Sequence, residues 1–237
     1  MPDNPRDDLD RQLESWAASQ PELEPSPEIQ RRIQSTLASS LTPVKPLPAQ
    51  RWLVGAFLAV FAACSAGLIA MMGQVGFHLM TGPQLAWMTA ILAAGGILFS
   101  LTLAWQMVPG SRQRFPFSLV IALSGVGVIG GMALLFPWQS SRAFVPEGWP
   151  CAIMELAVAV PATGVFWLLA RRGTLFASAG LGATLTGLAV FLALTPLQIQ
   201  CMFQQAPHLL VWHGGMAAIL IASGALIGAV RSGRWTS

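Results

Sequence analysis

Six stretches of this chain are each about 20 residues long and almost free of charge, the length that an apolar helix needs to cross roughly 30 Å of hydrocarbon. A closed β-barrel would instead show alternating segments of about ten residues. The sequence therefore predicts an all-α polytopic membrane protein with six transmembrane helices. The predicted spans are approximately 52–72, 85–107, 115–136, 151–170, 174–195 and 209–230, separated by breaks that include Pro137, Gly173 and Pro196.

The charge is unevenly distributed along the chain. Only 10% of the residues are charged, against about 25% in a soluble domain. Eight of the ten acidic residues precede residue 51. This division predicts a soluble partner-binding segment over 1–50 and a six-helix transmembrane domain over 51–237. The first apolar run follows an acidic start, so we expect it to be a retained span rather than a cleaved leader.

Basic residues predict the orientation of the spans, because loops rich in Lys and Arg stay in the cytoplasm. The segment 1–50, both termini and two of the five loops carry twelve of the thirteen basic residues, and the other side holds only Arg142. We therefore expect both the N- and the C-terminus to be cytoplasmic. The predicted outer loops are 73–84, 137–150 and 196–208.

With this topology, most of the reactive side chains fall on the outer side. Cys151 opens the fourth span, Cys201 lies in the third outer loop, His208 ends that loop, and His213 is one turn into the sixth span. Glu155 follows Cys151 by four residues and so shares its helical face. Cys64, in the middle of the first span, is read as a small buried hydrophobe.

The two outer cysteines, Cys151 and Cys201, leave three interpretations open. Outside the cytoplasm they meet an oxidising compartment, in which a structural disulfide persists. They would alternatively form a reversible thiol pair that senses oxidant or a thiophilic metal, or two unrelated buried thiols. Together with His208 and His213 they would supply four ligands, but the spacing matches no zinc motif, so no metal site or other cofactor is expected.

Glu155 is the only acidic residue within a predicted span. One interpretation is an interfacial carboxylate that reaches water. The other is a hydrogen-bond partner of His213 or a sensing group beside Cys151, because polar side chains inside a span are costly and usually have a partner.

Two glycine patterns in the spans are read as packing features. The run Gly125-Val-Gly127-Val-Ile-Gly130 fits a dinucleotide-binding loop, but it lies inside an apolar span with no strand before it, so we reject that function. Gly127 and Gly131, like Gly224 and Gly228, have the spacing that lets helices approach closely, within one chain or between copies in a homo-oligomer. No nucleophile–base pair or phosphate loop is apparent, and no enzymatic activity is expected.

The segment 1–50 contains two amphipathic patterns, over 7–18 and 26–41. In the second, Ser26 suits the N-cap and Pro27 the first turn. Such short helices bury little against each other, so we expect their apolar faces to bind a protein, as helix-in-groove ligands do. The acidic balance disfavours nucleic acid and an anionic lipid surface as direct partners. The predicted partner-binding residues are Ile29, Ile33, Leu37 and Leu41, followed by Leu9, Leu13 and Trp16.

Several elements, taken in order, resemble the NrsF-like family, the negative regulators of sigma F. They are the lead 43–48 (Pro-Val-Lys-Pro-Leu-Pro), Trp149-Pro150-Cys151, Arg171-Arg172-Gly173, a Gly-rich fifth span, Cys201, and His208 followed by Trp212-His213. The resemblance implies a six-span anti-sigma factor of the bacterial inner membrane, whose cytoplasmic segment holds an extracytoplasmic-function sigma factor. It also implies that Cys151 and Cys201 face the periplasm and sense external stress. Residues 1–42 are longer than the short arm associated with the family.

Two rival functions remain open at this point. A small transporter or channel would need a polar, water-accessible path through the spans, for which Glu155 and His213 alone are a poor basis. A membrane anchor that senses nothing would recruit some other cytoplasmic partner, and replacing both cysteines would then alter only stability.

Overall fold

The computed structural model describes residues 11–12, 15–16, 26–40, 48–108, 116–139, 143–171 and 178–233. The described part is all-helical, with no strand. The chain divides into two units, Met1–Pro46 and Leu47–Ser237, and each is treated separately below.

The first unit contains helix α2, Pro27–Ser40, which confirms the helix predicted over 26–41. Ser26 caps it as expected, because the Ile29 N–H donates to Ser26 Oγ at 3.3 Å. Ile29, Ile33 and Leu37 recur every four residues and therefore share one face, and each is at least half exposed. In the other predicted helix Trp16 is helical and exposed. Leu9, Leu13 and Leu41 lie outside the described residues.

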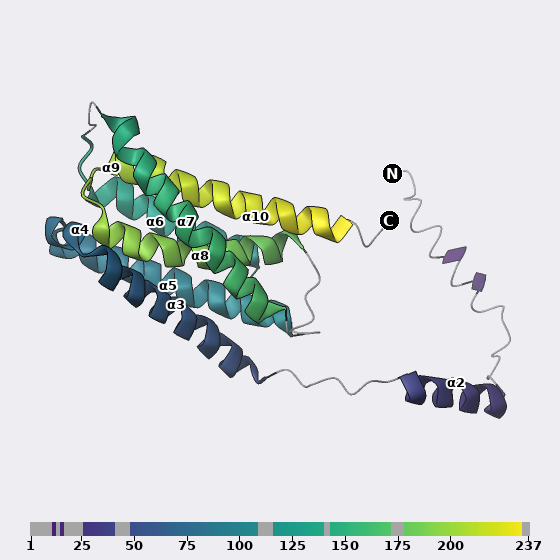
Figure 1. The fold of residues 1–237 in the computed structure, drawn as a ribbon. Coiled ribbons are helices and arrows are strands. Elements are labelled where there is room, and N and C mark those ends of the chain that lie inside the picture. The colour runs from purple at the N-terminus through teal and green to yellow at the C-terminus, as the bar shows by residue number, and fades with distance from the viewer. Residues whose placement is uncertain are drawn as a thin grey trace. The chain divides into compact units, whose positions relative to one another are not determined.

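The second unit is a bundle of long helices joined by short segments (Figure 1). Six of its helical segments are long and apolar enough to cross a membrane, which confirms the predicted number. The elements are α3 (Gln50–Met72), α4 (Val75–Leu79), α5 (Gly82–Met107), α6 (Phe117–Leu135), α7 (Phe144–Ala170), α8 (Ala179–Gln200), α9 (Ala206–His208), a π-helical segment (Leu209–Gly214) and α10 (Gly215–Gly233).

Three predicted span boundaries are wrong. Helix α7 begins at Phe144 rather than at residue 151, because Pro146 is tolerated in a first turn and Glu147 suits a helix N-terminus. Helix α8 begins at Ala179 rather than at 174, and it continues through Pro196, which was predicted to end it. A proline removes one helical hydrogen bond, but the residues around it, including Leu194 and Leu197, are buried, and this packing keeps the helix continuous.

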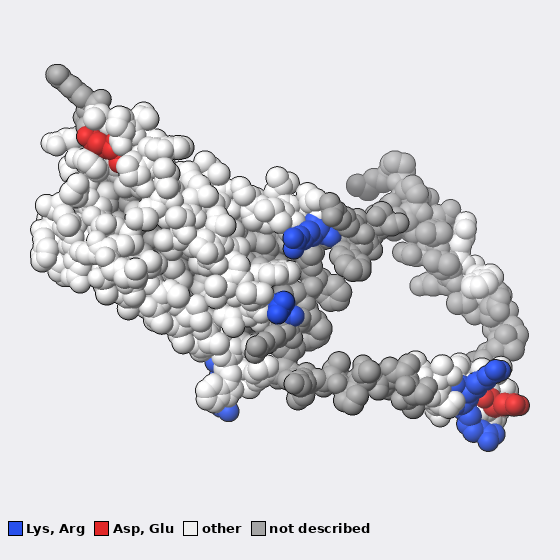
Figure 2. Space-filling view, viewed as in Figure 1, with Lys and Arg blue, Asp and Glu red and all other residues white. Residues whose placement is uncertain are grey.

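Successive spans run in opposite directions, so the bundle has two ends with different chemistry. We call the end that carries Arg51, Arg171 and Arg231 the arginine end, and the end that carries Cys151 and Cys201 the cysteine end. Among the described residues of the bundle, Figure 2 shows basic side chains at the arginine end and acidic ones at the opposite end.

Helix α8 lies at the centre of the bundle and is buried along most of its length, whereas the other spans expose most of theirs. It packs against α3, α5, α7 and α10. Glycines and aromatic rings interlock where it crosses α5. The ring of Phe191 fills the space beside Gly95, the ring of Phe99 fills the space beside Gly187, and the two ring centroids are 5.3 Å apart.

The contact between α8 and α10 depends on glycine. A Cβ atom at Gly182 would overlap the carbonyl oxygen of Gly224, and one at Gly228 would overlap the carbonyl oxygen of Ser178. The predicted packing role of Gly224 and Gly228 is thus confirmed within one chain. Gly127 and Gly131 likewise accommodate side chains of α5, those of Ile91 and Trp87.

We predict that Gly182→Ala destabilises the bundle by about 1–3 kcal/mol, because the added methyl group meets backbone that cannot move aside. Alanine is otherwise the better helix former, so a loss of stability isolates the packing effect. Thermal unfolding of the purified protein in detergent measures it. Gly125→Ala is the matched control, because nothing lies within 4 Å of a Cβ atom there. Equal melting temperatures for the two variants would contradict the prediction.

Candidate functional site

Four of the predicted site residues come together at the cysteine end of the bundle. Cys151 lies in the second turn of α7, Cys201 directly follows α8, His208 ends α9 and His213 lies in the π-helical segment. One ligand atom from each lies within 4.8 Å of the other three. Residues from three separate parts of the chain thus form one cluster, which we call the Cys₂His₂ cluster.

His208 is the hub of this cluster. Its Nε2 atom is 3.6 Å from Cys151 Sγ and 3.5 Å from Cys201 Sγ. Its ring centroid is 5.6 Å from that of His213. Cys201, His208 and His213 are buried, and Cys151 is partly buried.

The π-helical segment explains how two histidines five residues apart face the same point. In an α-helix of 3.6 residues per turn, residues five apart point in clearly different directions. A π-helix pairs residue i with residue i+5, and such segments are common at functional sites. Leu209–Gly214 adopts this form, so His213 is turned towards His208.

Cys151 and Cys201 are free thiols in the structure. Their sulfur atoms lie no more than 4.8 Å apart, so the partners of the disulfide considered from the sequence are neighbours. Hydrogen bonding with Cys151, burial and the charge of Cys151 raise the pKa of the Cys201 thiol above its usual range.

Several buried polar atoms beside the cluster have no hydrogen-bond partner among the described residues. Glu155 is fully buried rather than interfacial, and neither of its carboxyl oxygens is bonded. The predicted hydrogen bond to His213 is not formed, since both ring nitrogens of His213 are also without a partner. The same holds for His208 Nδ1, Gln198 Oε1 and Trp212 Nε1. Unsatisfied buried polar groups are rare in folded proteins and require an explanation.

Comparison with protein families identifies the chain. The family model NrsF, described as "Negative regulator of sigma F", matches residues 37–235. The chain belongs to the NrsF family. The matched region contains the whole Cys₂His₂ cluster but only the last turn of α2, Leu37–Ser40. Comparisons with curated proteins and with solved structures give no match.

In this NrsF-family protein the cluster fits a tetrahedral ion of the soft, thiophilic kind. Zinc binds sulfur at about 2.3 Å and imidazole nitrogen at about 2.0 Å, so neighbouring ligand atoms of a tetrahedron lie roughly 3.5 Å apart. The two sulfur–nitrogen distances at His208 have this length. The expectation of no metal rested on sequence spacing, which shows no zinc motif because the ligands come from three separate segments.

The same contacts place a cysteine beside a histidine, as in enzymes with a nucleophilic thiol, but the arrangement differs from theirs. A catalytic histidine is oriented by a third group on its other nitrogen, and His208 Nδ1 has no partner among the described residues. His208 Nε2 is also shared between two sulfur atoms. Both features suit a ligand set better than a general base.

Sequence reasoning missed the side chain that positions Cys201. Gln204 Nε2 donates to the carbonyl oxygen of Cys201 at 2.6 Å and contacts Gln198. The segment is held further by the Ala206 N–H, which donates to Pro137 O at 2.9 Å. A glutamine in a predicted loop fits many roles, so the sequence does not predict that Gln204 positions Cys201. Cys64 was also misjudged, because its side chain is exposed on α3 rather than buried.

We predict that Cys201 reacts slowly with a water-soluble maleimide in the metal-free protein. The thiolate is the reactive form of cysteine, and a raised pKa means that the thiolate forms only at higher pH. We therefore expect labelling of Cys201 at pH 8 to be at least about tenfold slower than in the heat-unfolded protein in sodium dodecyl sulfate. The labelling rate should increase with pH. Peptide mass spectrometry measures labelling at each cysteine. Equal rates in the folded and unfolded protein would contradict burial of this thiol.

Proposed function

We propose that this protein is an inner-membrane anti-sigma factor that responds to stress. Its N-terminal segment holds an extracytoplasmic-function sigma factor away from RNA polymerase, and the Cys₂His₂ cluster senses the signal that releases it. The observation that carries the proposal is the match to a family of negative regulators of sigma F over most of the chain.

The proposed orientation follows from the arginine end. Arg51, Arg171 and Arg231 lie there, and positively charged ends stay in the cytoplasm. Residues 1–50 and the C-terminus are then cytoplasmic, where a sigma factor works, and the Cys₂His₂ cluster lies on the periplasmic side.

The proposed contact with the sigma factor is the apolar face of α2. Ile29, Ile33 and Leu37 are exposed on one side of an otherwise polar helix, as in helices that bind a hydrophobic groove. The acidic balance of residues 1–50 suits a basic protein surface. The family match begins at residue 37, so most of this face precedes it and would set which sigma factor is bound.

The proposed signal is a thiophilic metal ion bound by all four residues of the cluster, with oxidation of the two thiols as the second candidate. The sulfur–nitrogen distances favour the metal. Binding shifts a two-state equilibrium only through a difference in affinity for the two states. Because the ligands come from α7, from the end of α8 and from the start of the sixth span, an ion would draw these three elements together.

The transporter alternative is less well supported by the arrangement of polar groups. Glu155, His208 and His213 all lie near the cysteine end, and the other buried polar side chains along the described spans are neutral, such as Ser100, Ser124 and Thr184. A path for ions or protons would need ionisable or water-accessible groups across the full thickness. We likewise propose no catalytic role.

We predict that the full-length protein, purified from its native membranes in mild detergent, retains an extracytoplasmic-function sigma factor identifiable by mass spectrometry. Ile33→Asp places a charge in the centre of the proposed face, and we expect it to lower retention at least about tenfold, as loss of a central contact does. Ser35→Asp, on the opposite face of α2, is the matched control. If Ile33→Asp retained as much sigma factor as Ser35→Asp, the α2 contact would be wrong. Absence of any sigma factor from the unmodified protein would contradict the anti-sigma function.

We predict that the purified protein binds one Co²⁺, a spectroscopic substitute for Zn²⁺, per chain. A tetrahedral site with two thiolates gives visible and near-ultraviolet absorption bands. Cys151→Ser or Cys201→Ser should weaken binding at least about tenfold, because the ion loses a sulfur ligand, whereas Cys64→Ser should leave it unchanged. In cells, the Cys151→Ser/Cys201→Ser protein should no longer release sigma-dependent transcription on metal stress. Bands that persist in the double variant would disprove the metal site, and unchanged induction would disprove the sensing role.

A further inference from the structure

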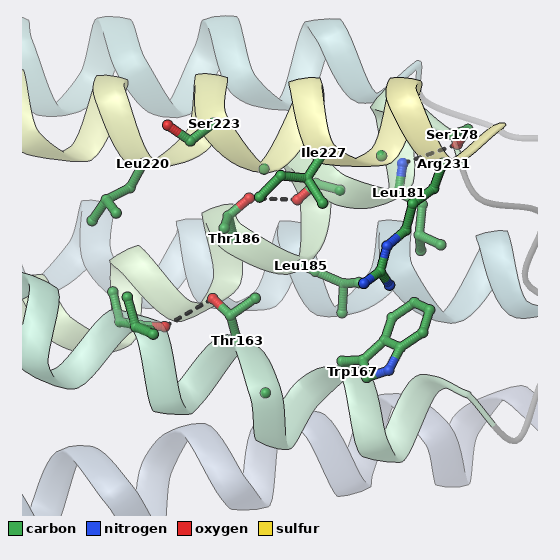
Figure 3. A pocket seen from close by; sticks show the side chains of 16 residues that line it. Thr163, Trp167, Ser178, Leu181, Leu185, Thr186, Leu220, Ser223, Ile227 and Arg231 are labelled. Carbon is green, nitrogen blue, oxygen red and sulfur yellow. Dashed lines mark hydrogen bonds between the residues drawn. The ribbon is translucent and has the colours of Figure 1, made fainter. Parts of the chain in front are cut away.

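A groove runs between α7 and α10, with α8 as its floor (Figure 3). Helix α8 packs against both neighbours, while α7 contacts the π-helical segment but makes few contacts with α10 itself. The glycines on α8 and α10 bring those two helices together, and the space beside Gly164 on α7 is open. The resulting cavity has a volume of about 430 Å³.

Apart from Ser178, which precedes α8, the residues that line the groove lie within candidate membrane spans, and its walls are apolar. Leu181, Leu185, Leu220 and Ile227 line it, and the hydroxyl groups of Thr163 and Thr186 are bonded to their own helices. From Leu220 to Arg231 the axis of α10 rises roughly 16 Å. One leaflet contributes about half of the 30 Å hydrocarbon thickness, so the groove has the length of one leaflet's acyl chains.

A positive charge marks the arginine end of the groove. Arg231 reaches across from α10, and its guanidinium carbon lies 5.8 Å from the centre of the Trp167 ring on α7 (Figure 3). From residue 51 onwards the sequence has only two acidic residues, Glu147 and Glu155. Glu155 is the nearer to Trp167 along α7, and it is still about 18 Å away. Neither acidic side chain of the described bundle therefore reaches Arg231.

We propose that this groove binds an acyl chain of an anionic phospholipid from the leaflet at the arginine end, with the lipid phosphate on Arg231. An apolar channel one leaflet long, ending in a cation, matches the two parts of such a lipid, and basic pockets between spans bind anionic headgroups. A second copy of the bundle would fill the groove with apolar side chains, but it carries no acidic residue at the level of Arg231. Charge complementarity therefore selects the lipid.

Native mass spectrometry of the delipidated full-length protein in detergent tests this proposal. The probes are phosphatidylglycerol and phosphatidylcholine with identical acyl chains. We expect one phosphatidylglycerol per chain, bound about fivefold more tightly than phosphatidylcholine. Arg231→Gln should lower the affinity for phosphatidylglycerol to that for phosphatidylcholine. Arg231→Lys, which keeps the positive charge, should retain most of the difference in affinity between the two lipids.

Gly164→Leu tests the groove itself, because a side chain there points into open space and fills the channel without a clash. We expect Gly164→Leu to weaken the binding of both lipids. Gly125→Leu, at an equally open site on α6 outside the groove, should weaken the binding of neither. Equal affinity of the unmodified protein for the two lipids would overturn the proposal, as would Gly164→Leu behaving like Gly125→Leu. A change from dimer to monomer in Gly164→Leu alone would also overturn it, in favour of a second copy as the occupant. None of these outcomes depends on binding of a sigma factor.

Discussion

The hydrocarbon of a bilayer offers no hydrogen-bond partner, and this constraint decides where chemistry can occur in the bundle. Along the spans, several threonine hydroxyl groups bond to the carbonyl oxygen four residues earlier, as those of Thr102, Thr163 and Thr195 do, and so need nothing from outside their helix. The Cys₂His₂ cluster and the carboxyl of Glu155, which are not satisfied within their own helices, lie together at the cysteine end. Buried atoms without a partner also occur elsewhere along the described spans, as at Ser100 Oγ, Ser124 Oγ and Gln106 Oε1, but these groups are neutral.

Helix α8 is the closely packed element from which Cys201 of the cluster extends. Its glycines bring α10 to backbone contact and let the rings of Phe99 and Phe191 interlock across α5. Close-packed contacts of this kind move as units rather than deforming gradually. Cys201 follows the last residue of α8, and the floor of the lipid groove is the first half of the same helix. The Cys₂His₂ cluster and the groove thus lie at opposite ends of one rigid element.

The sequence was sufficient for the number of spans and for the grouping of two cysteines and two histidines. Alternating spans put Cys151, Cys201, His208 and His213 at one end, and the structure brings them together as that order suggests. Four features had no sequence signal: the π-helical turn that aims His213, the central position of α8, the outward side chain of Cys64 and the full burial of Glu155. Each depends on which face of a helix its neighbours cover, and nearly uniform apolar spans do not encode that face in their periodicity. Pro196 shows the same limit, because local propensity predicted a break that burial of the flanking residues prevented.

The unsatisfied groups beside the cluster bear directly on how a signal would act within the proposed function. In the present arrangement Glu155 and both nitrogens of His213 are buried without partners, a costly condition. Coordination of an ion by His213 would give one of these nitrogens a partner and would make the other a donor that needs an acceptor. Binding would therefore relieve unfavourable burial as well as form metal–ligand bonds. Relief of this burial and the metal–ligand bonds would both favour the packing of α7, α8 and the sixth span that binds the ion. The free-energy difference between the two states that the proposed sensor requires would then arise at the cysteine end of the bundle.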